Sequence, residues 1–572
     1  MSILIARLSD GYLVNQGGKS ILINSTLTRE VDSEKFGLQS SFTRIDGIIG
    51  TITLKYTKYL ITIDESSVAG NINSNIIYQV TKFSILPIGV LTNNEEDKNY
   101  LSLLNQHLTN GTFFYSKNYD LTNSLQRQSK NFLNISNDKV ELNKLDKRFW
   151  WNEYLSEELF NFPEFITPLI YGYVKIVQTS ILSHKFSFGL ITRRSKYRAG
   201  TRYFRRGIDE NGNAANFNET EQILISNESG GNIFSYLQTR GSVPTYWAEI
   251  NNLRYKPKLI VNETNSIQST AKHFDEQVKL YGKNYLVNLV NQKGYEKPVK
   301  DSYERAVQLL ARPDDIKYVY FDFHHECRNM KWYRVQLLID QLVLLGYSNN
   351  NYFQSSSGKI LNSQDAVVRT NCMDCLDRTN VVQSTLGLWV LNNQFGKLGI
   401  NAIDDNFKFQ FQNIWADNAD YVSKAYSGTG ALKTDFTRLG RRTKLGALND
   451  LQNSLVRYLR NNYFDGLRQD GIDLFLGNFK PLDNNFNPFN MDKRSILIQY
   501  VPTIMWSSLG VLIFSLLFRK SKNYLLFHVF LFGVFLGSLN FVFKNNYYYV
   551  NWPKFVPVHT YVKAPLQTSK KD

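Results

Sequence analysis

Two long apolar runs near the C-terminus place the strongest limit on how this chain can fold. Ile496–Phe518 contains no charged residue, and as a helix it would span about 35 Å, more than the about 30 Å of a bilayer core. The second run, residues 524–543, has His528 and Asn540 as its clearly polar members. We therefore expect two transmembrane helices, 496–518 and 524–543, which would place both flanking segments on one side of the membrane.

The alternative is a buried helical hairpin of a soluble domain. It is the weaker interpretation, because soluble helices rarely stay apolar around their whole circumference. Aromatic residues near the predicted ends of the spans fit an interfacial belt. The connection 519–523 holds three basic residues, yet basic residues also flank the outer ends, so the charge rule favours cytosolic tails only slightly.

Cysteine usage gives a second indication of the compartment. The 572 residues include three cysteines, Cys327, Cys372 and Cys375, whereas a secreted protein of this size usually has more of them, in pairs. The N-terminal residues 1–14 lack the basic region and cleavage site of a signal peptide. We therefore expect the part before the apolar runs to face the cytosol.

The residues before the apolar runs divide into segments that differ in their predicted secondary structure. Residues 1–180 are predicted to be mainly strands, because short runs rich in Ile, Thr, Val and Tyr alternate with breaks. In residues 181–477, strand-like and helical runs alternate, which is typical of an α/β domain with a mostly parallel sheet. Residues 478–495 are rich in Asn and Pro and are predicted to be a linker, and 544–572 form a C-terminal tail.

The residues suited to chemistry gather in one loop. A strand-like run, 366–370, precedes Cys372, and a helix-like run, 381–393, follows it. A loop between a strand end and a helix N-terminus binds anions, because free backbone N–H groups and the helix dipole face the ligand. The same field stabilises a thiolate, so we expect a lowered pKa for Cys372.

The spacing within this loop indicates phosphate chemistry. Arg378 lies six positions after Cys372, so its planar guanidinium can fold back and bind two phosphate oxygens. Thr379 follows the arginine, and the loop includes Asp374 and Asp377. The pattern predicts a phosphatase of the Cys-x5-Arg type with Cys372 as nucleophile, which needs no metal or cofactor.

Other interpretations of the two loop cysteines remain open. Cys372 and Cys375 form a Cys-x-x-Cys pair, which also fits a redox pair or half of a zinc site. A zinc site would need Cys327 or a nearby histidine, and paired half-sites with the usual spacing are missing. The pair follows no thioredoxin-sized unit. A purely structural loop is a further alternative, and a reversible disulfide that shields the nucleophile is a separate hypothesis.

Residues 193–206 form the most basic stretch, with seven basic residues interleaved with aromatic ones. Alone, such a stretch could be a nucleic-acid patch or a set of buried ion pairs. We expect instead a surface or cleft that meets anionic lipid headgroups, and we expect no nucleic-acid partner.

Several motifs resemble those of the Sac-domain phosphoinositide phosphatases. The similarity covers most of residues 1–480, and with the two apolar runs it is nearest to the integral-membrane members of the endoplasmic reticulum and Golgi. The motifs are CMDCLDRTN at 372–380, RAGTRYFRRGID at 198–209, AN at 215–216, ETE at 219–221, RGSVPTYWAE at 240–249, FDFHH at 321–325 and GTGALK at 428–433.

The resemblance implies a β-rich N-terminal domain packed on an α/β catalytic domain, followed by two transmembrane helices. It implies hydrolysis of phosphatidylinositol monophosphates, mainly the 4-phosphate and also the 3-phosphate, with phosphoinositide lipids in membranes as partners. Cys372 would form a cysteinyl-phosphate, Arg378 would clamp the phosphate, and Asp377, or else Asp374, would be the general acid. The remaining expected substrate contacts are Asn371, Met373, Cys375, Leu376 and Thr379.

The loop departs from that of protein tyrosine phosphatases, since it has no glycine and its cysteine follows Asn371 rather than histidine. Two other function classes remain: an inactive phosphoinositide-binding membrane scaffold and a protein phosphatase. The expected location is the endoplasmic reticulum membrane and the Golgi, with two spans and the catalytic domain facing the cytosol.

Overall fold

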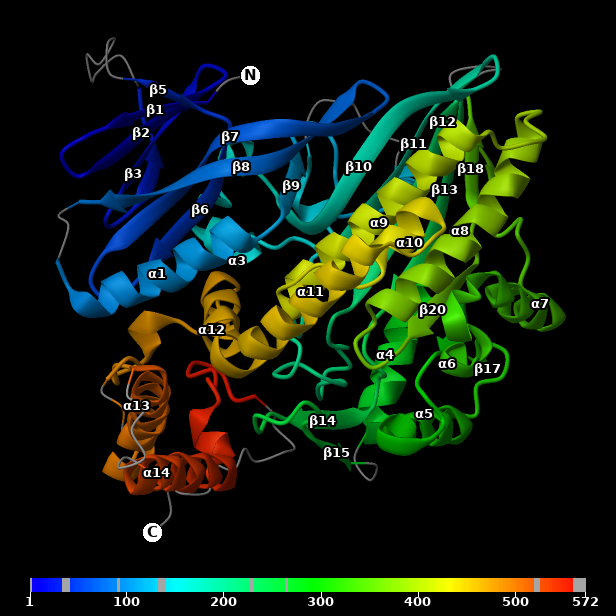
Figure 1. The fold of residues 1–572 in the computed structure, drawn as a ribbon. Helices are drawn as coiled ribbons and strands as arrows, with labels where there is room; N and C mark the ends of the chain where they lie inside the picture. The colour runs from blue at the N-terminus through cyan, green and yellow to red at the C-terminus, as the bar shows by residue number, and fades with distance from the viewer. Residues whose placement is uncertain are drawn as a thin grey trace.

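The computed structural model describes residues 3–32, 42–89, 93–131, 140–226, 231–262, 266–490, 492, 494–518 and 525–558. Within these ranges, the strands form three sheets, of five, thirteen and two strands. Figure 1 shows the two larger sheets in the upper part of the molecule and the C-terminal helices below them.

The first sheet is built from the N-terminal strands, in the order β4-β3-β2-β1-β5. Two glycines with positive φ, Gly17 and Gly18, join β2 to β3, as a two-residue hairpin turn requires. Ile3, Ile5 and Val14 pack into its core. The strands are β1 Ile3–Arg7, β2 Gly11–Gln16, β3 Lys19–Asn24, β4 Thr28–Glu30 and β5 Thr43–Ile45.

The large sheet runs through both halves of the chain, in the order β17-β16-β20-β13-β12-β11-β10-β9-β8-β7-β6, with β18 and β19 attached to β13. Its strands are β6 Gly47–Thr53, β7 Lys58–Ile72, β8 Asn75–Ile88, β9 Phe113–Ser116, β10 Ile170–Ile181, β11 His184–Arg194, β12 Asn218–Ser226, β13 Asn232–Arg240, β16 Lys283–Asn288, β17 Ile316–Tyr320, β18 Phe353–Ser356, β19 Lys359–Asn362 and β20 Ala366–Asn371.

This sheet is mixed. Strands β6 to β13 pair antiparallel, whereas β13, β20, β16 and β17 pair parallel. The predicted α/β class with a parallel sheet holds for that second part. The boundary predicted at residue 180 lies at the tip of the β10–β11 hairpin, so the sheet continues across it. The division into a β-rich domain and a catalytic domain stays a prediction.

Helices cover both faces of the sheet around β20. Side chains of α7, α8 and α9 pack on one face, and α4 and α5 pack beside β16 on the other. The helices are α1 Glu95–Asn110, α2 Leu125–Asn131, α3 Glu153–Ser156, α4 Ser266–Tyr281, α5 Lys297–Leu310, α6 Phe323–Glu326, α7 Gln336–Leu344, α8 Asp377–Lys397, α9 Asp405–Ser427, α10 Thr434–Leu439, α11 Lys444–Tyr463, α12 Asp465–Phe475, α13 Ile496–Phe518 and α14 Leu525–Lys544; the small sheet pairs β14 Tyr246–Ile250 with β15 Lys258–Asn262.

The basic stretch 193–206 is not an open lipid-facing surface, so that part of the prediction was wrong, whereas a lipid contact within a cleft stays a prediction. Its seven basic side chains are all buried or half-buried. Arg193, for example, bonds Glu219 (Nη1 to Oε1, 3.2 Å) and Glu221 (Nη2 to Oε2, 2.7 Å) on the neighbouring strand. A buried charge needs such a partner, and the alternation of the two glutamates along β12 places both on the face that Arg193 occupies.

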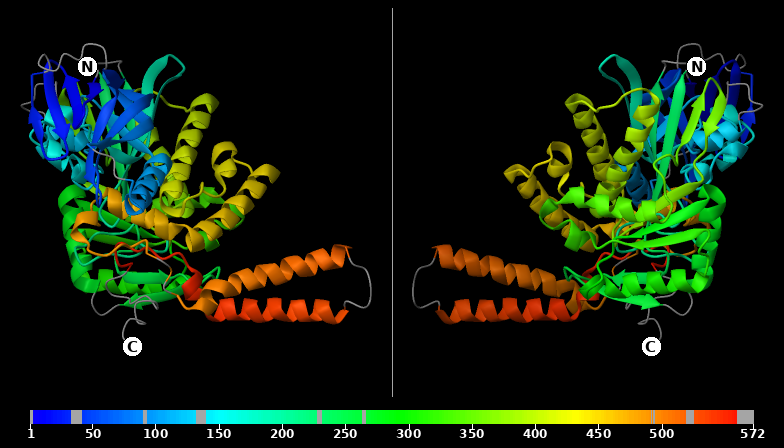
Figure 2. Two further views of the ribbon diagram at one scale, coloured as in Figure 1. Left: turned by 90° about the vertical axis from the view of Figure 1, so that its left-hand side faces the viewer. Right: turned by 90° about the vertical axis from the view of Figure 1, so that its right-hand side faces the viewer.

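The two apolar C-terminal helices are present, as predicted. Figure 2 shows α13 and α14 side by side, projecting away from the rest of the molecule, and each is long and apolar enough to cross a membrane. The Ser515 hydroxyl and His528 Nε2 lie 2.8 Å apart between them. Residues 519–524 and 559–572 lie outside the described residues. The side chains of α13 that turn inward recur every three or four positions, as in a coiled coil, at Ile498, Val501, Met505, Ser508, Leu512 and Ser515.

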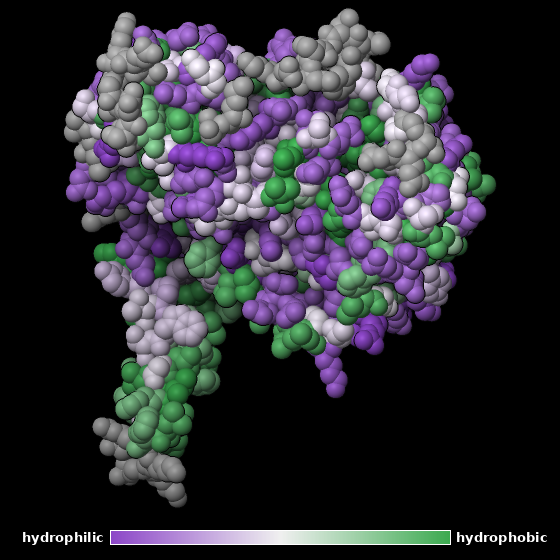
Figure 3. Space-filling view, turned by 90° about the horizontal axis from the view of Figure 1, so that it is seen from above, coloured by the Kyte–Doolittle hydropathy of each residue, from purple (hydrophilic) through white to green (hydrophobic). Residues whose placement is uncertain are grey.

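The outward faces of this hairpin are exposed and apolar. Figure 3 shows hydrophobic surface concentrated on the hairpin, whereas the face of the globular part in that view is mostly hydrophilic. Phe514, Phe518 and Phe530 are each exposed by more than half. Such a surface would be unfavourable in water and is stable in hydrocarbon, which favours a membrane hairpin over a buried soluble one.

Both ends of the hairpin are fixed to the globular part. Before α13, the Phe489 ring packs edge-on against Tyr100, with centroids 4.8 Å apart. After α14, Phe555 stacks on Phe479 at 4.1 Å, and its backbone N–H donates to Asp470 Oδ1 (3.0 Å). The predicted linker 478–495 is therefore not an extended tether, because Phe479 and Phe489 pack into an aromatic cluster with Tyr100 and Phe555.

The ion pairs of Glu219 should contribute to the acid sensitivity of the fold. Burial alone would raise the pKa of the Glu219 carboxyl, but Arg127 and Arg193 outweigh burial and lower the pKa to about 2. A carboxyl with a depressed pKa stabilises the fold above its ordinary pKa of 4.5, and that stability is lost as the pH falls towards 2. We expect Glu219→Gln to lose about 3–5 kcal/mol of unfolding free energy at pH 7 and to lose this acid dependence.

Denaturant unfolding of the full chain in detergent, followed by tryptophan fluorescence, would measure the change. The matched control is Glu95→Gln, which removes an exposed pair with Lys98 and should cost under about 1 kcal/mol. Equal stability losses in the two variants would contradict the expected role of Glu219.

Candidate active site

The predicted loop lies at the edge of the sheet where parallel strands end. β20 runs between β13 and β16, parallel to both, and α8 begins at Asp377. In open α/β sheets, ligands bind at this carboxyl edge. Cys375 has a positive φ of 53°, and its left-handed backbone conformation turns the loop back on itself.

Cys372 is held as the more acidic of the two loop thiols. Its sulfur accepts the Cys375 backbone N–H (2.9 Å) and lies 3.6 Å from the Thr379 hydroxyl. Hydrogen bonding with the Cys375 thiol, the charge of Arg378 and the Thr379 contact lower the pKa of Cys372 to about 7, although burial opposes them. Burial raises the pKa of Cys375 far above its usual range, so Cys372 is the thiol that ionises near neutral pH.

Arg378 starts from the first turn of α8, and Glu296 holds its guanidinium. Nη2 donates to Glu296 Oε1 (2.8 Å) and Nη1 to Glu296 Oε2 (3.1 Å), while Nη1 also donates to the Leu289 carbonyl (2.9 Å). This fork-to-fork geometry is the one that a phosphate would use. Burial would lower the pKa of Arg378, but the hydrogen bonds with Glu296 and the charges of Cys372 and Glu296 raise it.

The two loop aspartates have opposite electrostatic environments. Asp374 accepts hydrogen bonds from Arg202 (Nε to Oδ1, 2.9 Å) and Arg206 (Nη2 to Oδ1, 2.7 Å). Burial would raise its pKa, but these two arginines hold it well below the usual range. Among the hydrogen bonds in the described structure, the Asp377 carboxylate accepts only one, from the backbone N–H of Leu432 (2.8 Å). Burial raises the pKa of Asp377.

Four of the expected substrate contacts have side chains engaged within the protein. The buried Cys375 thiol donates to the Gly241 carbonyl (2.7 Å). Asn371 Nδ2 donates to the Gly241 carbonyl (2.6 Å). The Met373 side chain belongs to the core beneath β14, and Leu376 packs with Tyr426. The structure thus groups Cys372, Asp374, Asp377, Arg378 and Thr379 around one loop, and any contact of the other four with a ligand falls to their backbone.

Arg240, at the end of β13, is a site residue that the sequence did not single out. It pairs in register with Thr370, two positions before Cys372. Its side chain is fully buried, and within the described residues Nε, Nη1 and Nη2 have no hydrogen-bond partner. Burial lowers its pKa to about 10, opposed by the charges of Cys375 and Cys372. The thiolate of Cys372 can therefore supply the counter-charge that this guanidinium lacks.

Glu296 was also missed, because it lies 82 positions from Arg378 along the chain and its neighbourhood shows no motif. The arginine motif at 198–209 gave a signal, but its function as the anchor of Asp374 depends on contacts across the fold. Among the described residues, no group of three or more His, Cys, Asp or Glu side chains is arranged to hold a metal ion.

Comparison with known sequences identifies the class of protein to which this fold and this loop belong. Residues 46–328 match the SacI homology domain, and the chain belongs to this family, as the sequence motifs predicted.

Its similarity to individual relatives extends over nearly the whole chain. Phosphatidylinositol-3-phosphatase SAC1 of Saccharomyces cerevisiae is 48% identical over 580 residues, which cover 96% of this chain and 92% of that protein. The SAC1 protein of Drosophila melanogaster is 40% identical over 90% of this chain and 89% of its own length, and SAC1-B of Danio rerio is 41% identical over 84% of both.

Removing the buried cation should move the ionisation of the nucleophile. In Arg240→Met, the Cys372 thiolate loses a neighbouring positive charge, so its pKa rises and the midpoint of alkylation moves to higher pH. We expect alkylation of Cys372 by iodoacetamide at pH 7 to slow about tenfold, as measured by mass spectrometry of the Cys372 peptide across pH.

Arg240→Lys keeps the charge and should leave the midpoint near that of the natural chain. Thermal unfolding of both variants, together with alkylation of the buried Cys327, reports on folding. An unchanged midpoint in a folded Arg240→Met variant would show that this guanidinium does not act on the thiolate.

Proposed function

We propose that this protein hydrolyses phosphatidylinositol monophosphates to phosphatidylinositol, mainly the 4-phosphate and also the 3-phosphate, through a cysteinyl-phosphate on Cys372. The observation that supports this most is the lowered pKa of a buried thiol at the start of an anion-binding loop, with Arg378 beside it. The relatives named as phosphatidylinositol-3-phosphatases support a phosphoinositide substrate.

In the first step, the Cys372 thiolate attacks the phosphorus and the bond to the inositol oxygen breaks. Asp377 donates a proton to that oxygen, so it leaves as a neutral inositol hydroxyl. In the second step, the Asp377 carboxylate takes a proton from water, which attacks the phosphorus and releases inorganic phosphate and the thiolate. Asp377 suits this role because its pKa is raised, whereas Asp374 stays ionised between two arginines.

The phosphate oxygens would be stabilised by the loop N–H groups and by Arg378. Glu296 orients Arg378 in the described conformation, so phosphate binding must share the guanidinium with Glu296 or replace it. Arg202 and Arg206 act through Asp374, because they fix the loop backbone rather than face the reacting atoms.

The anchor supports a further part of the proposal. We place the two helices in the endoplasmic reticulum membrane and the Golgi, with the catalytic domain in the cytosol. Since Phe489 and Phe555 bind both ends of the hairpin to the globular part, the catalytic domain cannot swing far from its own bilayer. Substrate should therefore come from the membrane that holds the enzyme.

Substrates with different leaving groups can distinguish the role of Cys372 from that of Asp377. Full-length enzyme should release phosphate from phosphatidylinositol 4-phosphate with EDTA present, and Cys372→Ser should release none. Asp377→Asn should release phosphate from the lipid about 10²–10⁴-fold more slowly. On an aryl phosphate, its first burst of phenolate should be nearly normal, because that leaving anion needs no proton, whereas the later hydrolysis of the cysteinyl-phosphate still lacks its base.

Asp374→Asn is the matched comparison, since it should not show this dependence on the leaving group. Phosphate release from a panel of phosphoinositides and a phosphopeptide measures all variants. Turnover by Cys372→Ser would rule out the cysteinyl-phosphate, and lipid binding without turnover by the natural chain would favour the scaffold.

The docked anchor predicts action within one bilayer. Enzyme reconstituted into vesicles that contain the substrate should act rapidly, whereas substrate in separate vesicles should be hydrolysed at least about tenfold more slowly, because the docked segments prevent the domain from reaching across. Phe489→Ala with Phe555→Ala, which frees both ends, should reduce this ratio. Equal rates in the two arrangements would contradict the proposal.

A further inference from the structure

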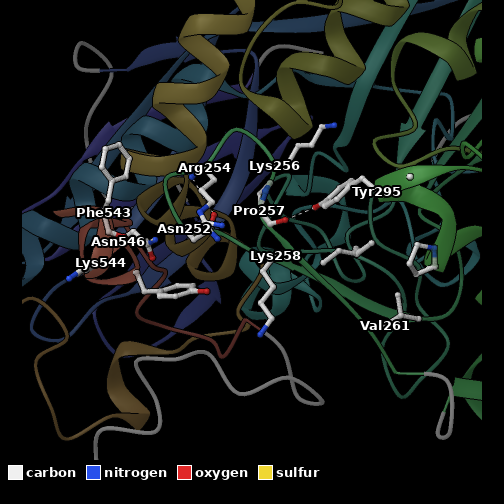
Figure 4. A pocket seen from close by; sticks show the side chains of 14 residues that line it. Asn252, Arg254, Lys256, Pro257, Lys258, Val261, Tyr295, Phe543, Lys544 and Asn546 are labelled. Atoms are coloured by element: carbon white, nitrogen blue, oxygen red, sulfur yellow. Dashed lines mark hydrogen bonds between the residues drawn. The ribbon is translucent and has the colours of Figure 1, made fainter. Parts of the chain in front are cut away.

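A basic cleft, whose lining includes no residue of the cysteine loop, lies between the β14–β15 hairpin and the end of α14. Its volume is about 1030 Å³. Figure 4 shows that three segments form it: the hairpin loop with Arg254, Pro257 and Lys258, the segment of Tyr295, and the end of α14 with Lys544.

The charge of this cleft is not compensated within the protein. Four basic side chains line it, Arg254, Lys256, Lys258 and Lys544, and the described lining residues include no carboxylate. All four are exposed, and none forms an ion pair with another described residue. This differs from the buried arginines of 193–206, such as Arg193, which have carboxylate partners. The positive field here is therefore available to an external anion.

The position of the cleft selects the kind of anion. Lys544 is the last residue of α14, so in a membrane-spanning hairpin it lies at the boundary of the hydrocarbon, where lipid phosphates are found. Phe543 beside it is exposed by 54% and offers an apolar contact below the charges. A lipid whose acyl chains lie along α14 would bring its phosphate between Lys544 and Lys258.

The walls are preformed. The Tyr295 hydroxyl donates to Glu249 Oε1 (2.8 Å) and lies 2.9 Å from the Pro257 carbonyl. On the opposite side, Tyr547 packs against Ala248 and its neighbours on β14. Because these contacts fix the β14–β15 hairpin to the end of α14, the basic side chains are already held near one another before a ligand binds.

We propose that this cleft binds the headgroup of an anionic glycerophospholipid of the enzyme's own membrane, as a second lipid site distinct from the substrate loop. The site recognises the phosphate with lysine and arginine and the lipid body with Phe543. It uses none of the residues that contact the scissile phosphate in the proposed mechanism, although Tyr295 is adjacent to Glu296.

The test uses the full chain purified in detergent and native mass spectrometry with added phosphatidylglycerol. This lipid is a phosphodiester, so it is not a substrate of a phosphomonoesterase. We expect retained phosphatidylglycerol to exceed phosphatidylcholine at least about tenfold, and the triple variant Arg254→Gln, Lys256→Gln and Lys258→Gln to lose this preference.

The control variant replaces with Gln three exposed lysines that do not line the cleft, namely Lys359, Lys397 and Lys408. It should bind lipid like the natural chain. Both variants should hydrolyse a soluble short-chain phosphoinositide at the natural rate, which shows that they fold and separates this proposal from the catalytic one. Equal lipid retention by the two variants would overturn the proposal, as would inorganic phosphate competing as well as the lipid does.

Discussion

The loop that holds Cys372 depends on the pairing of buried arginines with carboxylates. Arg206, fully buried, bonds Glu249 (Nε to Oε2, 2.7 Å), Asp374 in the loop and the Met373 carbonyl (2.8 Å). An isolated charge in such a place would cost several kcal/mol, so the arginine, its carboxylates and the loop must be ordered together. The blocks at 198–209, 240–249 and 372–380 are far apart in the sequence, but this pairing makes them one structural unit.

The parts that could be predicted are those whose cause is local. The strand before Cys372, the helix after it and the six-residue spacing to Arg378 all depend on neighbouring residues, and the structure has β20, the loop and α8 in those places. The apolar run Ile496–Phe518 became a helix with the same bounds, because its composition leaves few alternatives. The family followed from the same local motifs. The chemical roles of the loop residues remain proposals.

The parts that could not be predicted depend on contacts across the fold. The burial of Arg193 follows from its register with β12, and the carboxylate partner of Arg378 comes from another segment. From composition alone, the stretch around Arg193 resembled a lipid-binding surface. Likewise, the Asn- and Pro-rich segment before α13 looked like a tether, since its phenylalanines reveal their function only beside Tyr100 and Phe555.

The segment that follows α14 docks on the globular part, and this contact bears on how the chain is synthesised and folded. Asp470 on α12 accepts the backbone N–H groups of Lys554 and Phe555 (2.8 and 3.0 Å), and these residues leave the ribosome after both apolar helices. If the two helices span a membrane as proposed, the globular part cannot complete this surface until α14 has been made and the chain has returned to the same side. Membrane insertion would then precede the last step of folding, and a chain that stops before α13 leaves the buried Asp470 without these partners.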